Sequence, residues 1–259
     1  MNETLCRELS LTRTTSLIRE IDLHMHTTFS DGRGAVDEIT AAVEKKGLKI
    51  VAITDHYSEL LPLPMRMGKG QLKGYLEELE RTPFLKGVEA EILGDGTVSI
   101  SRKTADSLNI VLGGLHILHD IVFWHDSRPI LNPKKFVEDM RVVLIRSMER
   151  GLVDIVAHVT WLPEAIRAES DRLITDDWIK SVVESAGDRG VAIELSGAWN
   201  VPNERFVTEC LHQGVKLSIG SDAHEVKQVG EVSYALEILK RLAIPNDLVF
   251  IPKRGFEVI

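Results

Sequence analysis

The chain has 259 residues, of which 44% are hydrophobic and 27% are charged, and its formal net charge at pH 7 is -8. This balance is ordinary for a globular protein and excludes the disordered, collagen-like and coiled-coil classes. The acidic excess disfavours a nucleic-acid partner, because binding to a phosphate backbone depends on lysine and arginine side chains. We therefore expect a globular protein that acts on a small molecule.

Seven short apolar or β-branched runs, each a candidate buried strand, alternate with amphipathic segments along the chain. The candidate strands are residues 21–26, 50–56, 84–92, 110–116, 154–159, 191–197 and 216–222. The clearest candidate helices are residues 35–46, 133–150, 175–189 and 203–213. Each of these helices is followed directly by a glycine, the usual helix stop: Gly47, Gly151, Gly190 and Gly214.

Alternation of strands and helices predicts the α/β class, with a parallel sheet and crossover helices. About seven units without a dinucleotide-binding fingerprint favour a barrel over a doubly wound sheet. We expect one domain over residues 1–259, with residues 1–20 as an N-terminal extension. The long segments 57–70 and 117–132 follow the second and fourth strands, where barrel enzymes build their active sites.

The N-terminus and the cysteines favour a cytoplasmic location. Residues 1–20 lack the apolar core of a signal peptide or anchor, and no apolar run is long enough to cross a bilayer. Cys6 and Cys210 are far apart and form no CxxC pattern, which argues against a disulfide framework or a thiolate zinc site. We predict that both cysteines are reduced structural thiols.

Six of the nine histidines stand at the ends of candidate strands: His24, His26, His56, His116, His158 and His224. An isolated histidine is more often a hydrogen-bonded structural residue than a metal ligand. Independent structural histidines, however, have no reason to gather at strand ends in five separate units. Residues two apart in a strand share a face, so His24 with His26, and Asp222 with His224, can point into one barrel mouth. Imidazole and carboxylate ligands together suit zinc, manganese or iron.

The order of several short motifs resembles the polymerase and histidinol phosphatase (PHP) family. The motifs are D-L-H-M-H-T-T-F-S-D-G at 22–32, I-T-D-H at 53–56, G-V-E at 87–89, G-L-H at 114–116, A-H at 157–158 and S-D-A-H at 221–224. They span nearly the whole chain in the family's order. The resemblance implies a distorted (β/α)7 barrel, which agrees with the number of candidate strands.

The same resemblance implies a trinuclear centre of divalent zinc, manganese or iron ions. One ion would be held by His24, His26, Glu89 and Asp222, and a second by bridging Glu89 with His116 and His158. The third would be held by Asp31, His56 and His224. Some family members carry a histidine near the position of Asp31 and others an aspartate, so the resemblance fixes the role of Asp31 and the identity of the third metal less firmly than the other ligands.

The implied function is a metal-dependent phosphoesterase that hydrolyses a small phosphate monoester, in the manner of a histidinol, nucleotide or sugar phosphatase. Paired metals would lower the pKa of a bridging water, and the resulting hydroxide would attack phosphorus. Glu89, Asp222 and His224 would carry catalysis. Three divalent ions balanced by three carboxylates and one hydroxide leave about two positive charges, which complement a phosphate dianion.

Four other residues are candidates for substrate contact, each with a plain surface role as the alternative. Arg66 and Lys69 lie in the segment after the second strand, and His119 and Arg128 in the segment after the fourth. Glu194, at the end of the sixth strand, is either a partner that orients a ligand histidine or a local loop contact.

Three rival functions remain at this point. The first is a phosphodiesterase or nuclease of the PHP type, and the second is an amidohydrolase-like C–N hydrolase, although Glu89 stands where that family generally has a lysine. The third is a barrel that binds without catalysis. The sequence leaves open the identity of the ester, the metals and the oligomeric state.

Overall fold

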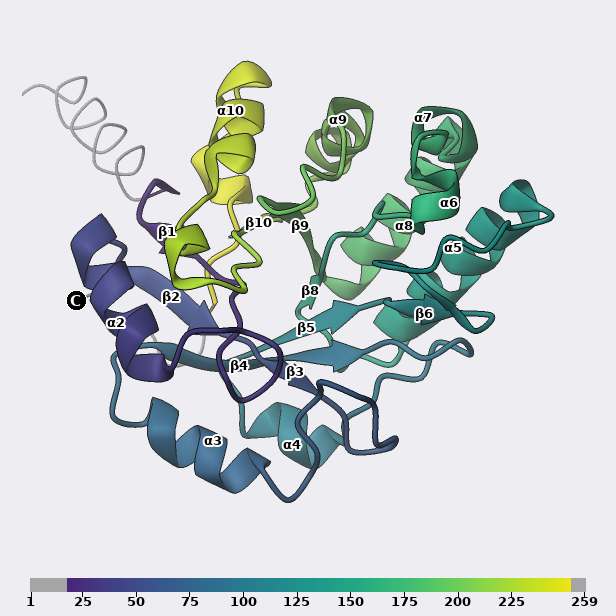
Figure 1. The fold of residues 1–259 in the computed structure, drawn as a ribbon. Helices are drawn as coiled ribbons and strands as arrows, with labels where there is room; N and C mark the ends of the chain where they lie inside the picture. Colours follow the sequence, from purple (N-terminus) through teal and green to yellow (C-terminus); the bar gives the residue numbers. More distant parts are fainter. Residues whose placement is uncertain (1–17, 253–259) are drawn as a thin grey trace, which may run out of the picture.

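The computed structural model describes residues 18–252, so Cys6 and most of the predicted N-terminal extension lie outside the described residues. Seven parallel strands form a sheet in the order β1-β2-β4-β5-β8-β9-β10 (Figure 1). They are β1 (Ile21–Asp22), β2 (Ile50–Ile53), β4 (Leu85–Glu91), β5 (Ile110–Gly114), β8 (Ile155–Val156), β9 (Ala192–Ser196) and β10 (Leu217–Gly220). A short strand, β3 (His56–Tyr57), pairs with β4 beyond the end of β2.

The first and last strands close the sheet on itself. The backbone N–H of Leu23 donates to the carbonyl of Ile219, and the N–H of Asp222 donates to the carbonyl of His24. Just beyond them, Met25 and Ala223 form a parallel bridge. The (β/α)7 barrel expected from the seven apolar runs is therefore confirmed.

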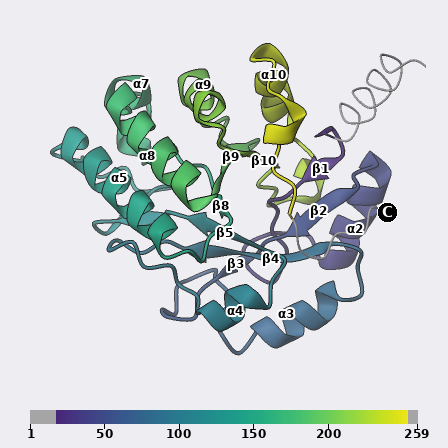
Figure 2. The same cartoon turned by 180° about the vertical axis from the view of Figure 1, so that it is seen from behind.

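Helices cover the outside of the barrel (Figures 1 and 2). They are α2 (Val36–Lys46), α3 (Leu72–Leu79), α4 (Arg102–Asp106), α5 (Pro133–Glu149), α6 (Glu164–Arg167), α7 (Ser170–Leu173), α8 (Asp176–Arg189), α9 (Glu204–Gln213) and α10 (Ser233–Arg241). Two short 3-10 helices lie on either side of α10 in the chain, at Val226–Gln228 and Asn246–Leu248. The four predicted helices are confirmed within one residue at each end, whereas α3, α4 and α10 lacked a clear signal.

Local chemistry explains where the predicted helices begin and end. The side chains of Asn132, Thr175 and Asn203 accept hydrogen bonds from backbone N–H groups in the first turns of α5, α8 and α9. Glycines in the left-handed conformation end three of the helices: Gly47, Gly190 and Gly214, with φ of 68°, 67° and 70°. These caps fix the point at which each chain segment turns back into the barrel.

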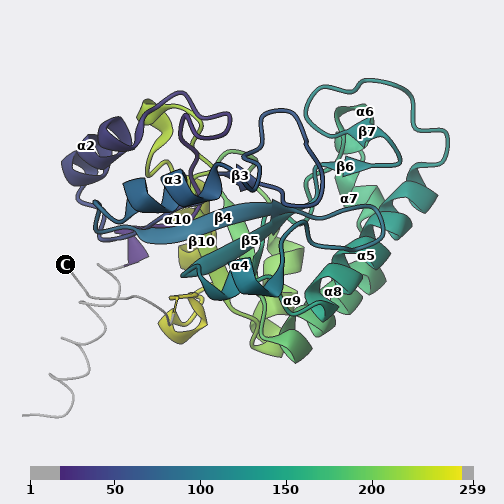
Figure 3. The same cartoon turned by 90° about the horizontal axis from the view of Figure 1, so that it is seen from below.

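The carboxyl ends of the strands meet at one mouth. β4 and β5 point toward the side of the molecule that carries the hairpin of β6 (Ile117–Leu118) and β7 (Ile121–Val122) (Figure 3). The loop after β3 lies on the same side, where Met67 bridges to Tyr57. Both long segments singled out in the sequence thus border the mouth. Among residues 18–252, no helix is long and apolar enough to cross a membrane.

Candidate metal centre

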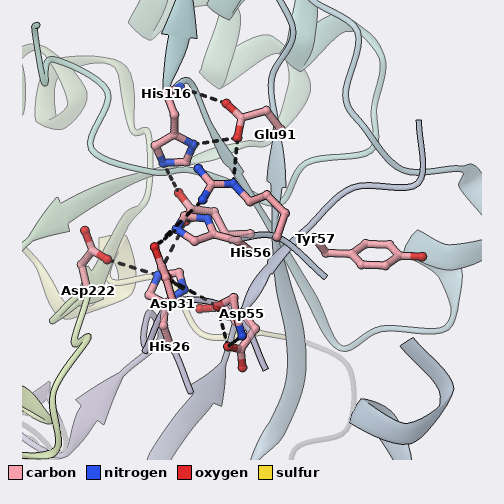
Figure 4. Close-up of polar contacts among 12 residues, drawn as sticks. His26, Asp31, Asp55, His56, Tyr57, Glu91, His116 and Asp222 are labelled. Carbon is pink, nitrogen blue, oxygen red and sulfur yellow. Dashed lines mark hydrogen bonds and ion pairs between the residues drawn. The ribbon is translucent and has the colours of Figure 1, made fainter. Parts of the chain in front are cut away.

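The nine predicted metal ligands converge at the barrel mouth, and Figure 4 shows five of them close together: His26, Asp31, His56, His116 and Asp222. Three groups of their ligand atoms each lie within 4.8 Å of one another. The groups are His24, His26 and Asp222; His56, Glu89 and His116; and His26, Asp31, His56 and His224. His158 joins them through Glu89, whose Oε1 lies 3.0 Å from His158 Nε2. Side chains from six different strands or strand ends therefore share one site.

Glu89 lies at the centre of the cluster, and its two carboxylate oxygens face different histidines. Oε1 is 3.0 Å from His158 Nε2 and 3.2 Å from His116 Nε2. Oε2 is 2.9 Å from His56 Nδ1 and 3.4 Å from His24 Nε2. The register of the sheet explains this position, because His56 of β3 pairs directly with Glu89 of β4. A carboxylate divided in this way would be placed to hold a cation on each of its two sides.

Asp222 divides its oxygens in a similar way. Oδ1 lies 3.2 Å from His26 Nε2 and 3.6 Å from His24 Nε2, while Oδ2 accepts a 2.7 Å hydrogen bond from Trp199 Nε1. The backbone of Asp222 has φ of 54°, a left-handed conformation that aspartate and asparagine adopt more readily than most residues. One oxygen is thus anchored, and the other is aimed at the histidine pair.

His24 and His26 bring two imidazole nitrogens together, with their Nε2 atoms 3.0 Å apart. The other nitrogen of His24, Nδ1, is 2.6 Å from Glu194 Oε1, to which it donates. The second oxygen of Glu194 accepts the backbone N–H of His158 at 2.8 Å. Glu194 therefore holds the ring of His24 rather than making a local loop contact, and it leaves Nε2 of this candidate ligand free to bind a metal.

Glu91 has a different place from Glu89. Its Oε2 lies 3.1 Å from His116 Nδ1, and its Oε1 accepts the backbone N–H of His116 at 3.2 Å. Arg66 Nε donates to the same carboxylate at 3.3 Å. Figure 4 shows Glu91 beside His116, on the side away from Asp222. Glu91 holds the back of a ligand ring, which leaves Nε2 of His116 directed at Glu89.

Asp31 faces the third group of histidines. Its Oδ1 is 3.2 Å from His224 Nε2, and its Oδ2 is 3.5 Å from His56 Nε2. His26 Nδ1 lies 3.9 Å from Asp31 Oδ1, so the structure associates His26 with this group as well as with His24. This sharing differs from the implied ligand sets, in which His26 served one ion.

The loop that carries Asp31 is held by a residue that the sequence analysis did not single out. Asp55 accepts hydrogen bonds from the backbone N–H and hydroxyl of Thr27 at 2.8 Å, and from those of Ser30 at 3.1 and 2.6 Å. Burial raises the pKa of Asp55, and these donors oppose the rise. The signal was present in the I-T-D-H motif, where Asp55 immediately precedes a ligand.

Unpaired buried atoms test whether these residues suit a bound cation. Among the described residues, six buried side-chain atoms lack a hydrogen-bond partner, and four of them belong to this cluster: His26 Nδ1, His56 Nδ1, Glu89 Oε2 and Asp222 Oδ1. Each such atom costs about 1–3 kcal/mol when it is left unsatisfied. Lone pairs of nitrogen and oxygen that meet at one place are the ligands of zinc-like divalent ions. The residues therefore fit metal ions.

The charges of the site depend strongly on one another. Burial opposes ionisation of Glu89, but the neighbouring His116, His56 and His24 hold its pKa well below the ordinary value. Burial also opposes protonation of His116, yet Glu91 and Glu89 outweigh it and raise the pKa of His116 to about 10. The pKa of His224 rises to about 9, since Asp31 and Asp222 outweigh burial there. Without metal, protons occupy positions that cations would take.

Metal affinity should therefore increase with pH. His116 and His224 have raised pKa values in the metal-free site, so they must lose protons before they bind an ion, and proton competition weakens as the pH rises toward 9 to 10. We expect zinc to bind at least tenfold more weakly at pH 6 than at pH 8, and activity to fall below about pH 6. Competition with a chelator of known affinity measures the change. Equal affinity at the two pH values would contradict this assignment of ligands.

The four candidates for substrate contact have different positions. The Arg66 side chain is only 4% exposed, lies 4.0 Å from Asp31 and sits over the Trp124 ring at 5.5 Å. Lys69, His119 and Arg128 are exposed and are not among the residues that line the cavity of the site. His119 pairs with Asp139, and Arg128 with Asp126. These three residues therefore lie on the surface, whereas Arg66 is a buried residue of the site.

A cavity of about 310 Å³ opens over the metal centre. Arg33, Glu225 and Gln228 line it with polar groups, whereas Trp124, Trp161 and Trp199 line it with aromatic rings. Trp161 and Trp199 were not predicted from the sequence, although Trp161 follows His158 by three positions. Cys210, by contrast, is distant from the site: it is a free, buried cysteine of α9, and burial raises the pKa of its thiol.

Known proteins of similar sequence and structure carry phosphatase names. The chain is 28% identical over 239 residues to "Probable phosphatase TTE1963" of Caldanaerobacter subterraneus, covering 88% of this chain and 85% of that protein. It is 26% identical to "Probable phosphatase YcdX" of Escherichia coli, covering 88% of each. A solved structure of histidinol phosphate phosphatase from Lactococcus lactis, complexed with zinc, L-histidinol and phosphate, aligns with a TM-score of 0.64 at 14% identity. That alignment covers 85% of this chain and 92% of the other and shows a shared fold.

The family model described as PHP domain matches residues 22–198. This range is well over half of the chain and includes the motifs around His24, Glu89 and His158. The resemblance drawn from the motifs is confirmed, and the chain belongs to the PHP family.

Proposed function

We propose that this protein is a metal-dependent phosphoesterase that hydrolyses a small phosphate monoester. The central observation is the carboxylate of Glu89, whose two oxygens face separate sets of histidines within one buried cluster. Such a bridge suits paired divalent ions better than a single ion. Three ions, of zinc, manganese or iron, are the number that the nine converging side chains support.

Divalent ions bound there would supply Lewis-acid activation of water and positive charge for the phosphoryl oxygens. The chain's own residues orient the reacting groups. Glu194 and Glu91 fix the tautomers of His24 and His116, so that the free nitrogens of both rings point inward. Arg66, which is held by Glu91 at the edge of the cavity, is placed to bind a phosphate oxygen.

The substrate class rests on three further observations. The relatives that are named phosphatases support a phosphate ester, and so does the neighbouring fold that was solved with phosphate and L-histidinol. A cavity of about 310 Å³ fits a small molecule. The third set of ligands, Asp31, His56 and His224, borders the open side of the centre, where it can hold oxygens of a terminal phosphate.

Monoesters should be better substrates than diesters. The ligand set of Asp31, His56 and His224 would hold phosphoryl oxygens that only a terminal phosphate offers in full. We therefore expect kcat/KM for p-nitrophenyl phosphate to be at least tenfold higher than for bis(p-nitrophenyl) phosphate. Both substrates release the same chromophore, so one assay on zinc- or manganese-loaded protein compares them. Faster hydrolysis of the diester would favour the phosphodiesterase alternative. Hydrolysis of C–N substrates with no phosphoester turnover would overturn the proposal.

A further inference from the structure

Three of the four tryptophans of the chain line the one cavity that contains the metal centre. We call Trp124, Trp161 and Trp199 the tryptophan wall. Trp161 and Trp199 pack with ring centroids 4.0 Å apart and planes inclined by 32°. The fourth tryptophan, Trp178, is buried in α8 and donates to the carbonyl of Val137. The aromatic surface is therefore concentrated beside the reaction centre.

The inner part of the wall is held rigidly. The Arg167 guanidinium lies over the rings of Trp161 and Trp199, 5.5 and 5.6 Å from their centroids. Its nitrogens donate to the carbonyls of Leu162 and Phe123 at 3.0 Å, which fixes the cation in place. A rigid aromatic face loses little conformational entropy when a ligand packs on it.

The wall also adjoins the metal ligands. Trp161 meets the ring of His158 edge-on, at a centroid distance of 5.3 Å, and the ring of His116 at 6.3 Å. Trp124 meets His116 at 6.2 Å from another side. A group that packs against these rings would therefore lie beside the candidate metal ligands His116 and His158.

Trp161 has an unused polar group. Its side chain is 3% exposed, and its Nε1 is a buried donor without a hydrogen-bond partner among residues 18–252. A buried N–H group without an acceptor is costly, so a ligand that offers an acceptor atom there gains more than the area of its ring alone would give.

Exposed apolar side chains gather at the cavity mouth. Met65 and Trp124 are 59% and 38% exposed, and both line the cavity. Leu60 and Leu61, on the same loop as Met65, are also exposed. Charged groups line the cavity as well: Arg33 and Glu225 form an ion pair with an N–O distance of 2.9 Å, and Arg66 lies over the Trp124 ring. A cavity with both kinds of lining suits a ligand with one flat apolar part and one charged part.

We propose that the tryptophan wall is the subsite for the leaving group of the substrate, and that it selects phosphate monoesters whose alcohol carries a flat aromatic or heteroaromatic ring. This inference rests on the proposed phosphatase function of the same site. The ring of the substrate packs against Trp124 at the mouth of the cavity and against Trp161, while the phosphate faces the metal centre. Short aliphatic phosphates leave the wall unused.

Matched esters of primary alcohols test this selectivity. Benzyl, cyclohexylmethyl and ethyl phosphate have similar leaving groups, so differences in kcat/KM on the metal-loaded protein report contacts with the organic group rather than intrinsic reactivity. We expect kcat/KM for benzyl phosphate to be at least tenfold higher than for ethyl phosphate. It should also be about threefold higher than for cyclohexylmethyl phosphate, because only the aromatic ring stacks on an aromatic face.

Variants locate the effect. Trp124→Ala should lower the ratio of benzyl to ethyl phosphate turnover about tenfold. Trp161→Phe keeps a ring but removes the unpaired N–H, and should weaken ligands that carry an acceptor atom on the ring more than benzyl phosphate. Leu131→Ala is the control, because Leu131 is 98% exposed, lies on the same loop as Trp124 and does not line the cavity. It should leave the ratio unchanged.

A binding measurement separates this inference from the proposed reaction. Benzylphosphonate should bind the metal-loaded protein at least tenfold more tightly than ethylphosphonate in calorimetry, whether or not any ester is hydrolysed. Equal affinities, or a benzyl preference that survives in Trp124→Ala, would overturn the subsite. Turnover of ethyl and benzyl phosphate at equal rates would also overturn it while leaving the phosphatase function intact. Absence of all phosphoester hydrolysis would instead refute the proposed function.

Discussion

Glu89→Gln should lower kcat on the order of a thousandfold and reduce the amount of bound metal. The glutamine amide keeps the volume of the side chain but replaces one oxygen by an NH₂ group that cannot bind a cation. In the structure the two oxygens of Glu89 face His158 and His116 on one side and His56 and His24 on the other. Loss of the bridge therefore affects two ion positions at once.

Glu91→Gln is the matched control, two residues further along the same strand and equally buried. Glu91 contacts the outer nitrogen of His116 and the side chain of Arg66. Glu91→Gln should lower kcat about tenfold, as is usual for residues that orient a metal ligand without binding the metal. Metal analysis and steady-state kinetics on both variants decide the assignment. The reverse order of the two losses would mean that Glu91 is the bridge.

Asp222→Asn should have the second-largest effect, a loss of several hundredfold in kcat/KM, on the order expected for a ligand that loses its charge. Asparagine adopts the left-handed φ of 54° as readily as aspartate, so the fold should be retained. What changes is Oδ1, the buried oxygen that faces His24 and His26 without a hydrogen bond.

Trp199→Phe provides the comparison for Asp222. It keeps an aromatic ring against Trp161 but removes the N–H that donates to Asp222 Oδ2 at 2.7 Å. Metal affinity should fall about tenfold, because the carboxylate loses its anchor but not its charge. Metal affinity should be measured for both variants. A larger loss of metal affinity in Trp199→Phe than in Asp222→Asn would show that metal binding here depends on the indole and not on the carboxylate.

Much of the fold followed from the sequence because its signals are local. Apolar runs predicted each strand of the barrel, and glycines that end helices marked the approach to four of them. Some strands were predicted too long for a physical reason. Residues 23–26, for example, leave the regular ladder after β1 and keep one parallel bridge and isolated hydrogen bonds to β10, to the segment after β10 and to Thr54. After this departure from the ladder His24 and His26 lie in the mouth, so the pattern indicated both candidate ligands while it misplaced the strand end.

Periodicity alone does not separate Glu89 from Glu91. Both belong to β4, both are buried, and residues two apart share a face. The two residues differ only in how far along the strand they lie. The pairing of β4 with β3 places Glu89 beside His56 and Glu91 beyond it. The pattern of β3 was too short to detect as a separate strand.

Contacts between distant loops were beyond the sequence. Arg66 looked like a loop charge, yet it is buried because Glu91 and Trp124, from two other segments, enclose it. The stacking of Trp161 on Trp199 likewise depends on loops that follow β8 and β9. No spacing rule connects such residues, because the barrel brings them together only after it closes.

Removal of metal tests the central claim most directly. The purified protein, stripped with a chelator and then titrated with zinc or manganese, should show no phosphomonoester turnover when free of metal. Activity should return only as more than one equivalent of metal binds per chain, because the cluster offers ligands for paired ions around Glu89. Full turnover by the metal-free protein would contradict the account.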